Sequence, residues 1–429
     1  MKRRRQKCRK AWQRYLDRKN SIDMGYNQKS DKSESIYITK RKGKAFLHSL
    51  AYYICRVFPV DRRKIVMWTF EGDGGYGCSP KYVAEEILKR NREGRTDYKI
   101  VWLVNDVKKE FPKEIEKVKS TLWNRAYYLS TAGTWISNTR TFYGTRKRKG
   151  QRYIQTWHAT ICIKPIGKYR GSLLPKMAYL VSAYDSKLID YVLSGSAWCD
   201  HMYRDGLIYD GEIIKTGTPR CDVLINQRKE KYRQMRDEYR LSEGAKIMLY
   251  APTFRGGSQN KNRDVNAEEA TVDFERLISS LEQRFGGEWY VFLRLHPQLA
   301  AKMEGLKTGQ ISERLIDVSQ RPDMNEIIAG SDAFLTDYSS AIFDANVIYI
   351  PGFIYADDLE DYVADRGDLF FDMYKLPFPV ALNNEELMEN IVKFDEEKYR
   401  KKTDEFMEEM GIFEDGRASE RVVELIEHG

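Results

Sequence analysis

Short apolar runs alternate with amphipathic stretches along most of the chain, and this alternation constrains the fold more than any other feature. The apolar run 64–70 is followed by a helical pattern at 81–91, and the next apolar run lies at 98–104. Strands that alternate with helices are typical of a parallel sheet with helical crossovers. The series continues with a helix and strand at 125–138 and with strands at 152–158, 191–196 and 212–217. The charged segment from 105 to about 119 has helical spacing, so a further helix is expected there.

The alternation starts again in the second half. Strands are expected at 246–254, 289–297, 314–319, 333–335 and 347–353, with helices at 273–285 and 322–331 and a charged joining helix at 226–246. A chain of 429 residues is too long for one ordinary core. We therefore predict an α/β protein with two Rossmann-type doubly wound domains that face a central cleft. The expected division is a basic arm at 1–44, a first domain at 45–225 and a second domain at 226–429.

Polar side chains gather where the predicted strands end. His158 lies at the end of one strand, Thr253 and Arg255 at the end of another, His296 at the end of a third, and Asp337 to Ser340 at the end of a fourth. Ligands of open parallel sheets bind outside the carboxyl ends of the strands. These residues therefore outline the predicted cleft.

The stretch 336-TDYSSAIFD-344 lies between a strand and a helix and has two interpretations. Ser and Asp are good N-caps, and every turn into a helix needs one. A helix N-terminus with hydroxyls and backbone N–H groups is also suited to a phosphate. The residues alone leave both interpretations open.

Several kinds of chemistry are not supported. The five histidines and the acids show no metal-ligand spacing, so neither a metal site nor a cofactor is predicted. The Gly-rich turn 71–77 lacks the register of a nucleotide loop, and it is interpreted as a loop beside the cleft. The six cysteines are scattered without a C-x-x-C pair, which argues against a disulfide framework and favours a reducing compartment. No signal peptide is apparent.

The positive charge is concentrated at the N-terminus. Residues 1–44 contain 16 Lys and Arg and 4 Asp and Glu, a net of +12, whereas the whole chain has a net charge of +9. Such an arm is a solvated tail, a nucleic-acid arm or an attachment to an anionic membrane surface. No base-reading module follows it, so no nucleic-acid partner is predicted. The aromatic segment 45–60 is too short to span a bilayer, and it is either a core helix or an interfacial segment beside the arm.

A set of short motifs resembles the CDP-glycerol glycerophosphotransferase family, which comprises teichoic-acid primases and polymerases and includes ribitol-phosphate transferases. The motifs are 155-QTWHAT-160, 217-GTPRCD-222, 250-YAPTFR-255, 293-LRLHP-297, 336-TDYSSAIFD-344 and 361-DYVADRGDLFFD-372, spread in order over roughly residues 60 to 425. The sequence departs from the family pattern at Ala159, where the family usually has Gly, and at 161–167. Because of this departure, the resemblance does not establish which acceptor the protein uses.

The resemblance implies a GT-B-like fold and a reaction in which a hydroxyl of a lipid-linked acceptor attacks the β-phosphorus of CDP-glycerol or CDP-ribitol and CMP leaves. It implies that His158 is the general base and that His296 donates to the phosphate or to CMP. The first domain would bind the acceptor and the second the donor. The implied donor-binding residues are Thr253, Arg255, Arg294, Asp337, Ser339, Ser340 and Asp344, and the implied acceptor-binding residues are Trp157, Thr160 and Lys164.

The resemblance also implies a peripheral enzyme at the cytoplasmic face of the plasma membrane, because its acceptor is lipid-linked. An alternative is a GT-B glycosyltransferase that uses a nucleotide sugar, and a third is a membrane-associated scaffold without activity. The sequence does not fix the polyol, the number of units added or the oligomeric state, and an oligomer is compatible with it.

Overall fold

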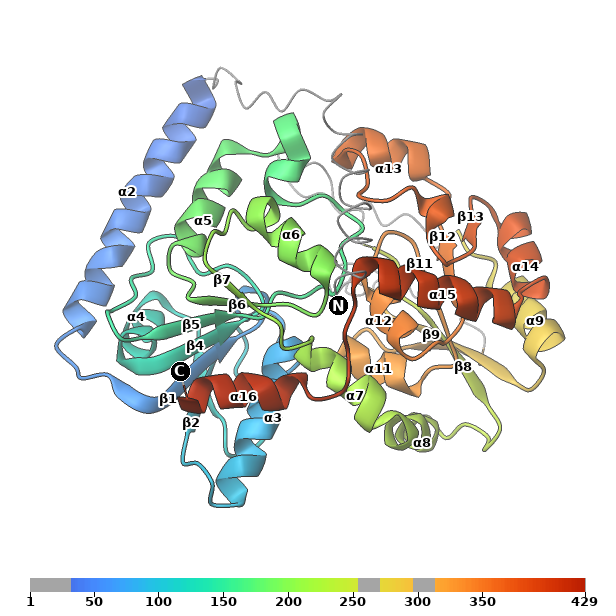
Figure 1. Cartoon of the computed structure of the whole chain (residues 1–429), viewed down its shortest axis with the longest axis horizontal. Helices are drawn as coiled ribbons and strands as arrows, with labels where there is room; N and C mark the ends of the chain where they lie inside the picture. Colours follow the sequence, from blue (N-terminus) through green and yellow to red (C-terminus); the bar gives the residue numbers. More distant parts are fainter. Residues whose placement is uncertain (1–31, 254–270, 296–312, 429) are drawn as a thin grey trace. The chain divides into compact units, whose positions relative to one another are not determined.

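The computed structural model describes residues 32–253, 271–295 and 313–428, and all structural statements below concern these residues. The chain forms two compact α/β units (Figure 1). Unit 1 contains residues up to 160, 166–222 and 411–429, and unit 2 contains 161–165 and 223–410.

Unit 1 is built on a parallel sheet that has seven strands in the described residues, in the order β3-β2-β1-β4-β5-β6-β7. The strands are β1 (Asp61–Trp68), β2 (Lys99–Val104), β3 (Glu116–Lys119), β4 (Ala132–Ser137), β5 (Arg152–Gln155), β6 (Tyr191–Leu193) and β7 (Glu212–Ile214). The helices are α2 (Lys32–Cys55), α3 (Cys78–Arg92), α4 (Leu122–Thr131), α5 (Lys176–Ser186), α6 (Ala197–Gly206) and α16 (Ala418–His428), with short 3-10 turns at Phe70–Gly72, Gly167–Leu173 and Pro219–Cys221. The first strand is central, as a doubly wound sheet requires.

Unit 2 repeats this arrangement with six parallel strands in its described part, in the order β10-β9-β8-β11-β12-β13. The strands are β8 (Lys246–Tyr250), β9 (Trp289–Leu293), β10 (Leu315–Asp317), β11 (Ala333–Thr336), β12 (Gly352–Tyr355) and β13 (Val380–Ala381). The helices are α8 (Arg228–Glu238), α9 (Phe274–Phe285), α11 (Met324–Gly330), α12 (Ala341–Val347), α13 (Leu359–Arg366), α14 (Asn384–Val392) and α15 (Glu396–Met410), with a 3-10 turn at Met373–Lys375. Helix α7 (Asp222–Asn226) begins at the residue where the chain passes from unit 1 into unit 2. The prediction of two Rossmann-type sheets is confirmed.

The C-terminal helix differs from the expected division, which placed all of 226–429 in the second domain. Helix α16 buries Val422, Val423 and Ile426 in the core of unit 1, together with side chains of α3 and the sheet. The buried Arg90 of α3 donates to Glu427 of α16 at 2.7 Å. Residues 411–429 therefore belong to unit 1, because an apolar helix face is buried there.

Two predicted elements are placed differently. The segment 105–115 is not helical, and residues 116–119 form the edge strand β3 rather than the end of a helix. Pro112 interrupts this segment, and the residue before a proline avoids helical dihedrals. The strand expected at 347–353 begins only at Gly352, because α12 runs to Val347 and Tyr349 has a left-handed φ of 58°.

Helix α2 crosses the expected boundary between the arm and the first domain. It begins at Lys32, twelve residues before the predicted end of the arm, and continues to Cys55. Gly144 lets it approach closely, because a Cβ atom there would lie 2.5 Å from the carbonyl oxygen of Ala45. No helix in the described residues has the length and apolar character that a membrane span requires.

Candidate active site

His158 lies three residues after the end of β5, where the imidazole is held by the backbone of the neighbouring strand. Its Nδ1 is 2.7 Å from the carbonyl oxygen of Asn138, the residue that follows β4. A carbonyl oxygen only accepts, so Nδ1 carries the proton in this contact and Nε2 of the neutral ring is the basic nitrogen. The geometry therefore suits His158 to accept a proton through Nε2.

The turn that carries His158 is strained and clamped. Trp157 has a left-handed φ of 50°, which is uncommon for a residue with a side chain, and its ring centroid lies 4.3 Å from that of His158. The buried Gln155 amide holds this turn, because its Oε1 accepts from Trp157 N at 3.0 Å and its Nε2 donates to the Thr139 carbonyl at 2.8 Å. Strained backbone of this kind persists where surrounding contacts fix it.

The Gly-rich turn after β1 borders the same place. The backbone N–H of Phe70 donates to the Asn138 side chain at 3.0 Å, and that of Glu71 donates to Thr139 Oγ1 at 3.1 Å. The Phe70 ring, which is partly exposed, lies 5.6 Å from the His158 ring. Because β1, β4 and β5 are neighbours in the sheet, their carboxyl ends bring these loops together.

Four residues of this cluster were missed by the sequence analysis: Phe70, Glu71, Asn138 and Arg140. The rule that found His158, namely polar residues directly after a strand, could also have found Asn138 and Glu71. The Asn138 side chain is completely buried, and its Nδ2 has no hydrogen-bond partner within the part of the chain that the structure describes.

A buried charged group supports the loop after β4. The carboxylate of Asp185, on α5, accepts from Thr141 N at 2.8 Å, and burial raises the pKa of Asp185 to about 6. The guanidinium of Arg140 lies 5.3 Å from the centroid of the Trp157 ring. Burial lowers the pKa of Arg140, and the charges of Asp185 and Glu71 oppose this effect.

The predicted acceptor-binding residues have different surroundings. Trp157 is buried beneath the His158 ring, as described above. Thr160 is completely buried, and its hydroxyl donates to Thr218 Oγ1 at 3.4 Å, which gives it a packing role inside unit 1. Lys164 is partly exposed and lies in the segment 161–165, which belongs to unit 2. Their assignment to acceptor binding stays a prediction.

In unit 2, Asp337 joins two strand exits. Both oxygens of its carboxylate accept from the backbone N–H of Thr253, at 2.9 and 2.8 Å, and one also accepts from Tyr338 N. Asp337 directly follows β11, and Thr253 lies three residues after the neighbouring β8. The predicted gathering of Thr253 and Asp337 at the carboxyl edge therefore occurs, and the acid shapes the loops there.

Arg294 directly follows β9 at the same edge of the sheet. Its guanidinium donates to the carbonyl of Arg321 at 2.6 Å, and burial lowers its pKa to about 10. A guanidinium kept in a buried place is stabilised by any anion that approaches it. Arg294 thus suits a phosphate neighbour, and its hydrogen bond to the Arg321 carbonyl is structural.

The two serines of the predicted phosphate turn are both partly exposed. Ser339 Oγ accepts from Ala341 N at 3.3 Å, and Ser340 Oγ accepts from the backbone N–H of Ile163 at 3.2 Å. The N–H groups of the first turn of α12 also bond locally, since Phe343 N donates to the Ser340 carbonyl. Ser339 therefore acts at least as a turn cap, whereas Ser340 ties the turn to the segment 161–165, and each hydroxyl keeps a hydrogen that can be donated.

Asp344 is buried on α12 and accepts from the Asn325 side chain of α11 at 3.2 Å. This contact links two helices of unit 2, and the assignment of Asp344 to donor binding stays a prediction. Arg255 and His296 lie outside the described residues, so the structure does not place them.

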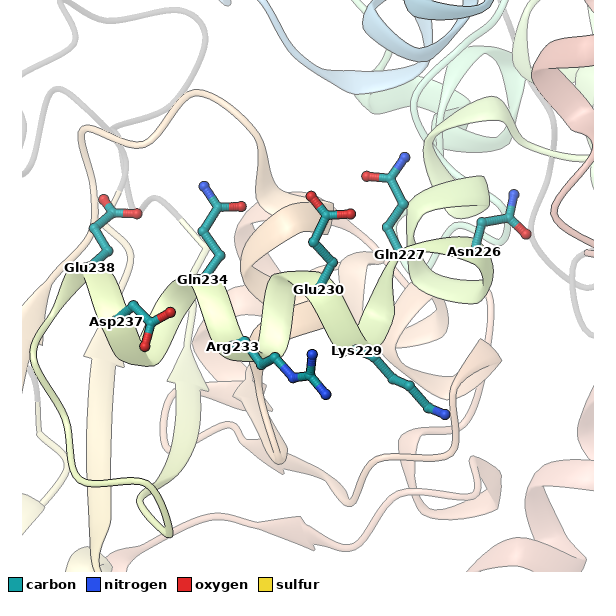
Figure 2. A pocket seen from close by; sticks show the side chains of 8 residues that line it. All are labelled: Asn226, Gln227, Lys229, Glu230, Arg233, Gln234, Asp237 and Glu238. Carbon is teal, nitrogen blue, oxygen red and sulfur yellow. The ribbon is translucent and has the colours of Figure 1, made fainter.

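A surface hollow of about 740 Å³ lies elsewhere in unit 2. Figure 2 shows its lining side chains projecting from the end of α7 and from α8, with both signs of charge among them. None of the predicted site residues lines it, and all of its lining residues come from one consecutive stretch of the chain, 226–238. It is therefore not a candidate active site.

Comparisons with known proteins agree with the motifs. The model of the CDP-Glycerol:Poly(glycerophosphate) glycerophosphotransferase family matches residues 50–428. A teichoic acid poly(glycerol phosphate) polymerase of Staphylococcus epidermidis is 30% identical over 83% of this chain and 50% of its own length. A teichoic acid poly(ribitol-phosphate) polymerase of Bacillus spizizenii is 29% identical over 90% of this chain and 60% of its own length. The chain thus spans about half to three fifths of these two relatives.

A solved structure of the wall teichoic acid polymerase TagF superposes with a TM-score of 0.75 at 25% identity, covering 93% of this chain and 98% of that chain. The same polymerase has been solved as a variant soaked with CDPG. The fold is thus GT-B-like, as expected. With a family model that matches most of its length, the chain belongs to the CDP-glycerol:poly(glycerophosphate) glycerophosphotransferase family.

Proposed function

We propose that the protein transfers a polyol phosphate, glycerol phosphate or ribitol phosphate, from a CDP-alditol to a hydroxyl of a lipid-linked acceptor in the synthesis of teichoic acid or a related cell-wall polymer. The proposal rests on the orientation of the His158 imidazole, whose Nδ1 contacts the Asn138 carbonyl oxygen, together with the membership of the chain in this family. The relatives include polymerases of both polyols, so both donors remain in the proposal.

In this reaction Nε2 of His158 accepts the proton of the acceptor hydroxyl while its oxygen attacks the β-phosphorus of the donor. The bond from the β-phosphorus to the bridging oxygen breaks, and CMP leaves with the electron pair. His296 donates a proton or hydrogen bond to the phosphate or to the departing CMP. Such a transfer depends on positioning and on compensation of phosphate charge.

The donor is assigned to unit 2. Arg294 and Arg255 supply positive charge, and the hydroxyls of Ser339 and Ser340 donate to the diphosphate. Asp337 holds Thr253 through both carboxylate oxygens, so its charge is already compensated by backbone N–H groups. The acceptor is assigned to unit 1, beside Trp157, His158, Phe70 and Asn138, with Thr160 as a further predicted contact. The remaining predicted contact, Lys164, comes from the segment 161–165 of unit 2.

The place of action is the cytoplasmic face of the membrane, since the acceptor is lipid-linked. The arm at 1–44 carries a net charge of +12, which is attracted to anionic lipid. The association is peripheral.

The decisive experiment incubates the purified protein with CDP-glycerol, CDP-ribitol or UDP-sugars, each with a soluble acceptor analogue, and measures CMP and UDP release together with product mass. Release of CMP with addition of a polyol phosphate is expected. Release of UDP with transfer of a sugar would instead identify a glycosyltransferase, and release of neither would favour a scaffold.

A further inference from the structure

Arg140 lies in the loop after β4, and contacts on both sides of it fix the backbone there. Before it, the carbonyl oxygen of Thr139 accepts from the Gln155 side chain at 2.8 Å. After it, the N–H of Thr141 donates to the buried Asp185 carboxylate at 2.8 Å. These contacts hold the point from which the Arg140 side chain starts.

The guanidinium at the end of this side chain has no polar partner in the protein. Arg140 makes no side-chain hydrogen bond and no ion pair with any other residue that the structure describes. Its guanidinium lies 5.3 Å from the centroid of the Trp157 ring, within the range of a cation–π contact. Such a contact leaves the five N–H donors of a guanidinium available to a ligand.

The surroundings of Arg140 favour an anion. Its side chain is only partly exposed, and burial lowers its pKa. The charges of Asp185 and Glu71 oppose this effect, but within the described residues neither carboxylate forms an ion pair with the guanidinium. A cation that is partly withdrawn from water is stabilised by an opposite charge that comes close. An anion is therefore the kind of ligand that this place suits.

The position of Arg140 relative to His158 indicates which anion it would be. Both side chains adjoin the Trp157 ring, whose centroid lies 4.3 Å from that of His158 and 5.3 Å from the guanidinium of Arg140. In the proposed reaction His158 accepts the proton of the attacking hydroxyl, so a molecule that also reaches Arg140 carries a negative charge close to that hydroxyl.

A polyol-phosphate unit has this combination of groups. Its terminal hydroxyl lies only a few bonds from its phosphate, whereas a terminal sugar offers uncharged hydroxyls. The planar guanidinium can bind a phosphate through two N–H donors at once, which a point charge cannot do. The phosphates of the donor are assigned to unit 2, where Arg294 and Arg255 supply positive charge, so the cation of unit 1 is left for the acceptor.

We propose that Arg140 binds the phosphate of the last polyol-phosphate unit of the acceptor and so determines which acceptors the protein uses. An acceptor that already ends in a polyol phosphate is selected over one that ends in an uncharged group. The inference rests on the proposed function and names the acceptor class of that same site. Arg140 takes no part in proton transfer, because a guanidinium stays protonated.

The test compares the full chain with Arg140→Gln, with Arg140→Lys and with a matched control, Arg146→Gln. Arg146 belongs to the same loop of unit 1 and is also partly exposed, but its guanidinium lies 5.8 Å from the centroid of the Tyr184 ring instead of beside Trp157. Chemical denaturation shows whether each variant is folded.

Steady-state kinetics use two soluble acceptor analogues on the same alkyl chain. One ends in a polyol phosphate and the other ends in the same polyol without a phosphate, with glycerol and ribitol each tested. Calorimetry measures the binding of the phosphate-terminated analogue in the absence of a donor.

Arg140→Gln should raise KM for the phosphate-terminated analogue by about 10–100-fold, because bonds to a charged group are lost. Its affinity in calorimetry should fall by the same factor. KM for the donor and KM for the phosphate-free analogue should be unchanged. Arg140→Lys keeps the charge without the planar fork, so it should raise KM for the phosphate-terminated analogue by a smaller factor. Arg146→Gln should behave as the wild type.

Three results would overturn the proposal: equal KM values for Arg140→Gln and the wild type, an equal rise for both analogues, or a rise in KM for the donor. If no CDP-alditol is turned over with either analogue, the proposed function fails and calorimetry alone decides. Weaker binding of the phosphate-terminated analogue to Arg140→Gln than to the wild type would then still support the anion site. Unchanged binding, or no binding to the wild type, would refute it.

Discussion

Replacing Gln155 by Leu tests whether the turn that carries His158 must be held for catalysis. The buried Gln155 amide makes three hydrogen bonds, to Trp157 N, the Thr139 carbonyl and the Tyr153 hydroxyl, at 3.0, 2.8 and 3.0 Å. Each such bond contributes about 1 kcal/mol net, and each buried group left without a partner costs about 1–3 kcal/mol. The free energy of unfolding should therefore fall by about 3–5 kcal/mol. Leu fills most of the volume of the Gln side chain, so no large cavity adds to this loss.

The catalytic effect has a separate cause. Without the amide, Trp157 can relax from its left-handed φ of 50°, and the relaxation moves the adjacent His158 away from the Asn138 carbonyl. A displacement of about 1 Å can cost about 10²-fold in rate. We expect kcat to fall by about that factor. KM for the donor should change by less than about threefold, because a displaced base affects the chemical step and leaves substrate binding intact.

The matched control is Thr216→Val, which removes one buried hydrogen bond, to the Gly217 carbonyl, in the same unit but away from β5. Both variants are compared by chemical denaturation and by steady-state kinetics below the unfolding range. If Gln155→Leu is destabilised and yet turns over at the rate of the control, Gln155 supports only the fold and the argument for a held base fails.

Three further predictions concern single groups. His158→Ala should cut turnover by about 10²–10⁴ and leave donor affinity nearly unchanged, and a folded variant with full activity would remove its role as base. Ser339→Ala with Ser340→Ala should weaken CDP-alditol binding by about 1–3 kcal/mol in calorimetry, whereas unchanged affinity would make both serines turn caps only. The free energy of unfolding of Asp185→Asn relative to wild type should rise with pH. Burial raises the pKa of Asp185 to about 6 in the folded state. The stability that the protonated Asp185 carboxyl contributes to the wild type is therefore complete below about pH 4 and is lost as the pH rises past 6. The gain between those limits should reach about 3 kcal/mol in denaturant titrations, and a constant difference between variant and wild type would contradict it.

The sequence was sufficient for the parts of the fold that follow from local patterns. Alternating apolar runs predicted both sheets, and the rule that strand ends gather at one edge placed Thr253 beside Asp337 and His158 beside the next strand exit. The same rule was not applied to the turn at 71–77, whose glycines suggested a plain loop, and so Phe70 and Glu71 were missed. The contact from Asn138 to His158 uses a backbone carbonyl, and because every residue has one, the sequence could not predict this contact.

Long-range packing accounts for the remaining differences. Helix α16 belongs to unit 1 because Val422, Val423 and Ile426 complete a core that begins more than 300 residues earlier, and periodicity shows that a helix has an apolar face without showing which core receives it. The boundary of the arm was misplaced for a related reason. The charge change at 44 divides the sequence, whereas the inner face of α2 is continuous through Ala45, Ser49 and Tyr52.

The contacts of Asp337 and Asp344 are compatible with the proposed binding of a diphosphate in unit 2. An anionic ligand is repelled by any carboxylate whose charge is not compensated, and in unit 2 the carboxylate of Asp337 accepts from two backbone N–H groups, those of Thr253 and Tyr338. Asp344 is turned into the protein, where the amide of Asn325 donates to it. Ser339 and Ser340 are partly exposed at this turn, and Arg294, which is partly buried, follows β9, the second strand from β11 in the sheet. The two interpretations of the stretch 336–344, caps and phosphate site, are therefore compatible, because the acids bond to the protein while both serines stay partly exposed.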